Sequence, residues 1–382
     1  TALDTVPCNV RLLACCDEET GVEGGIEAIH AHDAPLALDD PDRILRAEVA
    51  LIPDGGLETT AGSSGVAFLE ASFARNVPLS GVVDYGLELV RLHELARSWR
   101  SVYPSPDWPD RNAPEPVITG RASLTRFDIG DAPAGTSLRL AAAHAETDAA
   151  NQIPRAVTLL FAGAPQERAT LATRLGPLVP APFRLEPAGA TSLRVPPETL
   201  ALQVIGQAAH GGYPHRGHDP VPVALALLGD AGRRGYVDLA PAVRATFTVD
   251  LRLPPEMELA EGLGKALGSV NAWAHAHSPD ARVEAPPSRC RPGYALPVDH
   301  PAAVKLEQIL ADTVGSHGIR GEYGGTDASA LRGLKTPRGA PLPALVFGSM
   351  DPIANIHDAE ESVDPRKIAG VALAIERFVR EP

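Results

Sequence analysis

An apolar run that ends in three consecutive acidic residues is the first feature of this chain that could carry chemistry. The segment LLACCDEETGVEGG spans residues 12–25 and contains Asp17, Glu18 and Glu19. Alternating side chains in the preceding NVRLLAC predict a β-strand, so the carboxylates would project together from its carboxyl end. Carboxylates this close repel one another unless a cation lies among them or water surrounds them. The cluster therefore indicates either a cation-binding site or a solvated loop.

A further acidic residue follows a second short apolar strand. The segment AEVALIPDGG stops at Pro53 and Asp54, and the intervening GVEGGIEAIHAH predicts a helix. In parallel sheets built from strand, helix and strand, ligands bind outside the carboxyl ends of the strands. Glu18, Glu19 and Asp54 are therefore expected on one rim of the sheet.

A histidine near the end of the chain could complete this set. His357 lies in MDPIANIHDAEESVD, between the predicted strand PALVFGS and a closing helix, DPRKIAGVALAIERFV, whose apolar face predicts packing on a sheet. Alone, such a histidine is usually structural or merely exposed. Joined with Glu19 and Asp54, it gives oxygen and imidazole ligands of the kind that Zn²⁺ accepts. Hydrolysis also needs a base free of metal to take a proton from the attacking water, and Glu18 is the natural candidate.

Five motifs occur in a fixed order along the chain: DEETG, IPDGG, GQAAHGGYPHRGHDP, GGTDASAL and NIHDAEE. As a set they resemble the zinc-dependent family of aminoacylases, carboxypeptidase G and cytosolic dipeptidases (metallopeptidase family 20). The resemblance runs from about residue 8 to the C-terminus, and ETDAANQIPRAVTLLF is similar to the lid insertion of the extended dipeptidase branch. It implies an α/β catalytic domain with an inserted α+β sandwich for the lid and dimerisation. It also implies two zinc ions per complete site, with cobalt or manganese as alternatives.

The same resemblance assigns roles to the acidic residues and histidines. It implies Glu18 as general base, Glu19 as ligand of one metal and Asp54 as ligand of the other, with His357 as the ligand opposite Glu19. His210 in AAHGGYP is similar to a lid histidine that polarises the scissile carbonyl and stabilises the oxyanion, often across a dimer interface.

Substrate-binding residues are implied in the same way. Asn151 and Arg252 match lid positions that the dipeptidase branch uses for substrate, and Arg252 could hold a terminal carboxylate with two parallel hydrogen bonds. Gly324, Gly325 and Thr326 of GGTD would let the backbone approach the substrate. An ordinary turn is the alternative interpretation of that motif.

One part of the family pattern has no counterpart. Upstream of the acidic pair, family members carry a histidine in an HxD motif and a bridging aspartate, and this sequence has almost no residues there. We therefore expect a sequence that starts about 100 residues late. The rival from another class is a degenerate homologue without metal that acts as a binding or assembly protein.

Other histidines have simpler interpretations. The His-x-His pattern in AIHAHDAP is typical of another class of metal hydrolase, but that class needs it at the end of a barrel strand and here it falls on or just after a helix. His275 and His277 lie at a predicted helix end, where a cation meets the helix dipole favourably. His215 and His218 are expected in a solvated loop.

The composition of the chain limits the classes of molecule that it is expected to bind. The 382 residues include 48 acidic and 34 basic side chains, giving a net charge of -14. With no basic stretch, nucleic acid and anionic membranes are poor partners, and a small molecule is expected. No apolar run of about 18 residues and no basic-then-apolar leader is present. The four cysteines have no CxxC spacing, which favours reduced thiols in the cytoplasm.

The elements that must position these residues form two predicted domains. From residue 155 the pattern alternates between strand and helix, as an open α+β sandwich requires, whereas residues 60–150 are hard to assign beyond one helix in DYGLELVRLHELARSW. We predict a discontinuous catalytic domain, residues 1–62 and 290–382, and a lid and dimerisation domain, residues 63–289. The predicted function is a cytoplasmic, homodimeric metallo-amidohydrolase that cleaves a dipeptide or N-acyl amino acid.

Overall fold

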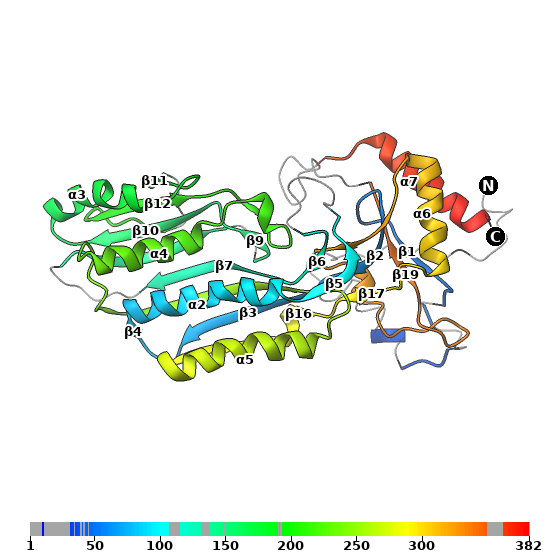
Figure 1. Ribbon diagram of the computed structural model, residues 1–382, viewed down its shortest axis with the longest axis horizontal. Coiled ribbons are helices and arrows are strands. Elements are labelled where there is room, and N and C mark those ends of the chain that lie inside the picture. The colour runs from blue at the N-terminus through cyan, green and yellow to red at the C-terminus, as the bar shows by residue number, and fades with distance from the viewer. Residues whose placement is uncertain are drawn as a thin grey trace.

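The computed structural model shows an elongated α/β molecule in which two β-sheets lie end to end (Figure 1). It describes residues 10, 31–33, 35–38, 40, 43–44, 46–106, 115–130, 137–147, 150–189, 191, 193–349 and 362–381. Each sheet has its own hydrophobic core. The predicted α/β class, with a second α+β sandwich, is confirmed.

The smaller sheet has five strands. They are β1 (Ala50–Ile52), β2 (Thr59–Ser63), β17 (Tyr294–Ala295), β18 (Ile319–Glu322) and β19 (Ala344–Val346). The β1–β19 and β2–β18 pairs are parallel, whereas β19 and β17 are antiparallel to β2. Helix α6 (Pro301–Val314) packs on β2, and α7 (Pro365–Arg380) packs on α6.

The larger sheet has ten strands, and every pair in it is antiparallel. The strands are β3 (Gly65–Phe73), β4 (Val77–Pro78), β7 (Arg121–Gly130), β8 (Arg139–Glu146), β10 (Ala156–Ala162), β11 (Arg184–Pro187), β12 (Thr199–Ile205), β14 (Ala242–Leu253), β15 (Ala281–Glu284) and β16 (Cys290–Arg291). The main path runs β11-β12-β10-β8-β7-β14-β3-β15. Strands β7 and β14 are neighbours in the interior of this path. The start of β7 and the end of β14 lie at the junction with the smaller sheet.

Three long helices lie along one face of the larger sheet (Figure 1). They are α2 (Leu79–Arg97), α4 (Pro220–Arg233) and α5 (Leu259–His277), while α3 (Pro165–Leu175) packs near β11 and β12. Close packing of α2 requires glycine at position 86, because a Cβ there would lie 2.9 Å from Leu225 of α4 and 3.0 Å from Phe247 of β14. Helix α4 begins with a capped first turn, because Asp219 Oδ1 accepts a hydrogen bond from Val221 N at 2.9 Å and Pro220 occupies the first helical position.

The closing helix packs differently from the prediction. Val371 and Ala374 are its buried residues, and both face α6 rather than a sheet, while Ile368 is 49% exposed. The apolar stripe predicts a helix with one buried face correctly but does not say that another helix covers it.

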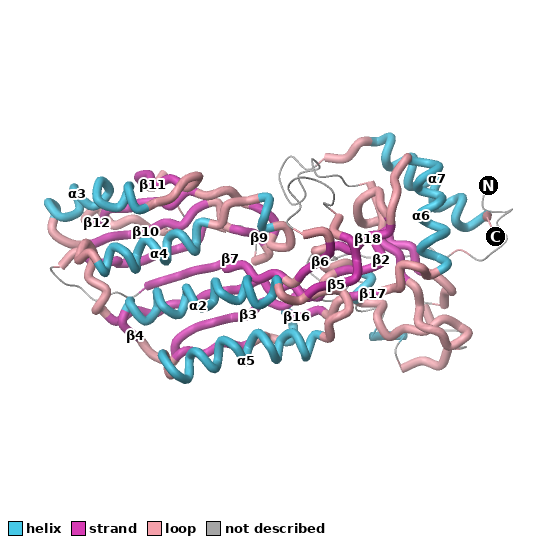
Figure 2. Tube along the Cα trace, in the orientation of Figure 1, coloured by secondary structure: helices cyan, strands magenta, loops and turns pink. Residues whose placement is uncertain are grey.

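A small hairpin-like pair joins the two bodies. Strands β5 (Arg100–Pro104) and β6 (Val117–Thr119) form a two-stranded sheet that lies against β18 (Figure 2). The Tyr103 hydroxyl donates to the Leu296 carbonyl at 2.5 Å, and its ring lies where a Cβ on Gly62 would come within 2.8 Å. This part of the predicted lid therefore packs into the core of the smaller sheet.

Short elements complete the description. The strands β9 (Gln152–Ile153) and β13 (Ala209–His210) pair with each other, and 3-10 turns occur at Gly176–Leu178, Pro214–Arg216, Pro287–Arg289 and Asp327–Ser329. Among the helices that the structure describes, none is both long and apolar enough to cross a membrane.

Candidate substrate-binding site at the junction of the two sheets

The predicted lid histidine is held beside the predicted asparagine by a very short ladder. In the β9–β13 pair, His210 lies opposite Gln152, and the Gly211 amide donates to the Asn151 carbonyl at 2.6 Å. Asn151 and His210, which lie about 60 positions apart in the sequence, are thus brought together. The Gly212 amide donates to His210 Nδ1 at 3.1 Å, which leaves the ring proton on Nε2.

Gly211 joins this histidine to the predicted substrate arginine. A Cβ on Gly211 would lie 2.1 Å from Asp250 Oδ2, so only glycine fits there. Asp250 is fully buried, and its two oxygens accept hydrogen bonds from Arg252 Nε at 2.7 Å and Arg252 Nη2 at 2.8 Å. Two donors of the predicted carboxylate clamp are therefore already engaged within the chain. The role of Arg252 in binding substrate stays a prediction.

The loop after His210 also contacts the smaller sheet. A Cβ on Gly212 would lie 3.1 Å from the Tyr323 carbonyl oxygen, and the rings of Tyr213 and Tyr323 are 5.6 Å apart, edge to face. The Tyr213 hydroxyl donates to the Glu322 carboxylate. The motifs AHGGYP and EYGGTD, distant in sequence, therefore meet at the junction.

The glycine-rich turn lies directly beyond this contact. Its first residue, Gly324, donates its amide to Glu322 Oε1 at 3.1 Å. Thr326 Oγ1 donates to Ser63 Oγ at 3.0 Å, at the end of β2. A Cβ on Gly325 would lie 3.1 Å from Val66, the cross-strand neighbour of Arg252. The turn is therefore packed against the same row of the larger sheet that carries the arginine.

The junction thus gathers the predicted lid and turn residues into one cluster. Its members among the predicted residues are Asn151, His210, Arg252, Gly324, Gly325 and Thr326. Three further members, Asp250, Tyr213 and Glu322, were not predicted from the sequence. Asp250 had a usable signal, because it lies two residues before Arg252 on a strand and must face the same side.

The proposed metal ligands are represented here by Asp54 alone. Glu18, Glu19 and His357 lie outside the described residues. Asp54 is exposed and follows β1 directly. Within the described part of the chain, no group of three or more His, Cys, Asp or Glu side chains could hold a metal.

The end of β1 nevertheless lies beside the strand that leads toward His357. The Phe347 amide donates to the Ile52 carbonyl at 3.0 Å, and the Gly348 amide donates to the Gly56 carbonyl at 2.6 Å. The turn IPDGG is therefore packed against the carboxyl end of β19. This parallel pairing is the arrangement that the shared-rim prediction requires for Asp54.

The ladder separates that rim from the glycine-rich turn. Val346 pairs with Ile52 on one side and with Thr60 on the other, so these three residues lie at one level of the sheet. Beyond this level, β1 continues toward Asp54, while the antiparallel β2 continues in the opposite direction toward Ser63. Asp54 and the carboxyl end of β19 therefore lie on the same rim of the sheet, whereas the glycine-rich turn held by Ser63 lies on the opposite rim.

The histidines at the end of α5 and His218 are exposed, as their simpler interpretations predict, whereas His215 is half-buried in the turn Pro214–Arg216 and not in a solvated loop. His277 Nδ1 lies 3.0 Å from the Trp273 carbonyl in the last turn of α5, and the two rings stack at 5.0 Å. His32 contacts the neighbouring Asp33 at 2.9 Å, whereas His30 lies outside the described residues.

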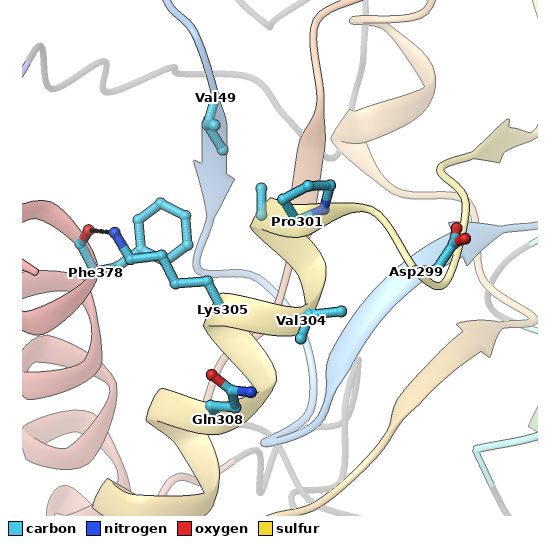
Figure 3. A pocket seen from close by; sticks show the side chains of 8 residues that line it. Val49, Asp299, Pro301, Val304, Lys305, Gln308 and Phe378 are labelled. Carbon is cyan, nitrogen blue, oxygen red and sulfur yellow. Dashed lines mark hydrogen bonds between the residues drawn. The ribbon is translucent and has the colours of Figure 1, made fainter. Parts of the chain in front are cut away.

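A surface groove elsewhere contains none of the predicted residues. It lies along α6 and is lined by Val49, Asp299, Pro301, Ala302, Val304, Lys305, Gln308 and Phe378 (Figure 3). The Lys305 ammonium closes one side, because it donates to the Phe378 carbonyl at 2.8 Å and lies over the Phe378 ring. None of the residues that line this groove belongs to the junction cluster.

Comparison with known proteins gives distant similarity in shape only. No family model and no curated protein matches the sequence. Solved structures that are similar include aminopeptidase PepT from Bacillus cereus (TM-score 0.43, 11% identity, 94% of this chain and 62% of that one). Human carnosine dipeptidase 1 has a TM-score of 0.42 at 9% identity, with 95% and 64% covered. A tripeptidase from Staphylococcus aureus has a TM-score of 0.40 at 10% identity, with 94% and 62% covered. The chain thus spans less than two thirds of each of these structures.

Proposed function

We propose that this chain acts as a metal-dependent hydrolase that cleaves the amide bond of a dipeptide or N-acyl amino acid. One observation carries the proposal: the AHGGYP loop contacts the EYGGTD turn across the junction of the two sheets. A lid histidine placed against a glycine-rich turn is what a hydrolase needs to hold a carbonyl between a donor and open backbone.

His210 is suited to the donor role. Its Nδ1 accepts the Gly212 amide, so Nε2 carries the proton and can donate to the oxygen of a scissile carbonyl. A donor aimed at the charge that develops in the transition state lowers the barrier by about 3 kcal/mol. His210 would thus stabilise the oxyanion.

The metal half of the site rests on Asp54 and on residues outside the described part. Carboxylate oxygens and one imidazole form a donor set that suits zinc, with cobalt or manganese as alternatives. When bound, zinc supplies a water of lowered pKa and a Lewis acid for the carbonyl. Glu19, Asp54 and His357 would hold it, while Glu18 would take the proton from the water. A homodimer in the cytoplasm belongs to the same proposal.

The test is Glu18→Ala in the full chain, with Asp17→Ala as the matched control. We expect Glu18→Ala to lower the hydrolysis of glycyl-L-leucine by at least about a hundredfold, because a general base contributes that much or more. Zinc content, measured by mass spectrometry of the metal, should stay near that of the parent. If zinc is lost instead, Glu18 is a ligand and the roles are misassigned.

The alternative is a homologue without metal that binds a ligand or partner through the junction. It is favoured by the separation of Asp54 from the glycine-rich turn along the sheet. Metal analysis of the 382-residue chain decides between the two. Stoichiometric zinc with peptidase activity excludes the alternative, and a metal-free, inactive protein supports it.

A further inference from the structure

The junction contains a buried cation that no described carboxylate neutralises. Arg121, the first residue of β7, is 3% exposed. Its Nε and Nη2 atoms are buried and have no hydrogen-bond partner among the residues that the structure describes. The guanidinium lies over the ring of Tyr323, 4.1 Å from the ring centroid. A ring face attracts the charge, but it does not accept hydrogen bonds from the N–H groups as an anion would.

A second buried arginine lies directly opposite. Arg121 pairs with Arg252 in the register of β7 and β14, and Arg252 is also 3% exposed. Opposite residues on antiparallel strands have Cα atoms about 4.5–5.5 Å apart, and like charges in that arrangement repel. Asp250 accepts two hydrogen bonds from Arg252 and compensates its charge. The only carboxylate described beside the two arginines is thus paired with Arg252, and the two arginines together with Asp250 carry one net positive charge.

This positive charge adjoins the glycine-rich turn. Tyr323, whose ring covers Arg121, immediately precedes Gly324, and its buried hydroxyl also has no hydrogen-bond partner. Val66 pairs with Arg252 on the side away from Arg121, and a Cβ placed on Gly325 would lie 3.1 Å from Val66. Unsatisfied donors are thus concentrated at the turn where the proposed substrate approaches.

We propose that Arg121 is the residue that recognises a carboxylate of the substrate, with the Tyr323 hydroxyl as a further donor. Arg252, held by Asp250, supports the site by its charge. A single carboxylate balances the single excess charge and satisfies a guanidinium fork with two parallel hydrogen bonds. Because Arg121 belongs to the larger sheet and Tyr323 to the smaller one, separation of the two bodies opens the guanidinium to the ligand. This inference rests on the proposed function only for the identity of the ligand as a dipeptide or N-acyl amino acid.

The proposal is tested by binding rather than turnover. Calorimetric titration of the full chain, dialysed free of divalent metal, compares glycyl-L-leucine with its C-terminal amide, which lacks the charge. We expect the parent to bind the acid about tenfold or more tightly than the amide, as a hydrogen-bonded charge pair implies. Arg121→Met should bind both probes equally. Arg126→Met, an exposed arginine on the same strand, should keep the preference.

Stability separates recognition from a structural role. A buried cation without a counter-ion is costly, so Arg121→Met should melt at the same temperature as the parent or higher. If Arg121→Met instead melts many degrees lower, Arg121→Lys is the deciding variant, because lysine keeps the charge but lacks the two parallel donors. Weakened binding of the acid by Arg121→Lys at parental stability supports the proposal. Unchanged binding of the acid overturns it. An equal affinity of the parent for acid and amide, or an acid preference that survives in Arg121→Met, also overturns it. Absence of hydrolysis after zinc is restored, with an acid preference that depends on Arg121, would defeat the proposed catalysis and leave this inference standing.

Discussion

Asp250 is the charge on which the junction depends, and its neutralisation gives a strong prediction. Asp250→Asn keeps the shape of the side chain, so the close contact with Gly211 is preserved while the negative charge is lost. Two buried guanidinium groups then face each other across β7 and β14 with no described carboxylate between them. Any loss of stability therefore reports electrostatics and not a cavity.

The magnitude follows from burial. Asp250 is 0% exposed and Arg252 is 3% exposed, so water screens the pair very little. Removing one partner of a buried pair costs about 3–5 kcal/mol, and we expect Asp250→Asn to lower the free energy of unfolding by about 3 kcal/mol or more. The matched control is Asp280→Asn, which breaks a pair whose arginine, Arg75, is 75% exposed. That change should cost at most about 1 kcal/mol.

Urea unfolding followed by circular dichroism measures both variants. Adding Arg121→Met to Asp250→Asn should recover at least about 1 kcal/mol, because it removes one of the two unpaired cations. An Asp250→Asn variant as stable as Asp280→Asn would refute the reasoning. So would a double variant that is no more stable than Asp250→Asn alone, since the two arginines would then not repel each other across β7 and β14.

The remaining predictions concern one glycine and one histidine. Gly211→Ala should lower the free energy of unfolding by about 1–3 kcal/mol, because its Cβ would overlap Asp250. As a control, Gly81→Ala in helix α2, where a Cβ meets nothing within 4 Å, should raise the free energy of unfolding by about 0.5–1 kcal/mol. Equal effects of the two variants in urea titrations would contradict the packing argument. The hydrogen bond that His144 Nδ1 donates to the Asp128 carboxylate raises the pKa of His144 above its ordinary 6.5. The contribution of His144 to stability should therefore be full below about pH 6.5 and disappear as the pH rises through the folded pKa. Melting temperatures across this pH range should show the loss in the parent and not in Asp128→Asn.

Local patterns predicted most elements after residue 155. Alternation in VRATFTVDLRL and helical spacing in DPVPVALALLG are local properties, and both elements appear as β14 and α4. The capping role of Asp219 was also predictable, because a side-chain acceptor before proline satisfies a free amide at a helix start. These elements place the lid side of the junction.

Strands before residue 150 were missed for a physical reason. Residues 66–69 of β3 are all apolar, so the alternation that marks a half-buried strand is absent there. In β7 the alternation persists in ASLT, but the first five residues are all buried, polar ones included. The same region hides Arg121, whose partners Tyr323 and Arg252 lie 202 and 131 positions away. Their meeting depends on strand register, which no local pattern encodes.

The contact between Gly211 and Asp250 explains why motifs that are separate in sequence act as one unit. Gly211 follows the lid histidine, and Asp250 holds Arg252, which lies opposite Arg121. A larger residue at position 211 would push the carboxylate away from Arg252 and would also displace the amide that bonds to Asn151. His210, Asn151 and Arg252 are therefore connected through Gly211 and Asp250, and we expect substitutions among them to have non-additive effects. If Arg121 binds a ligand carboxylate as proposed, the same contacts would link that binding to the position of His210, the proposed donor to the scissile carbonyl.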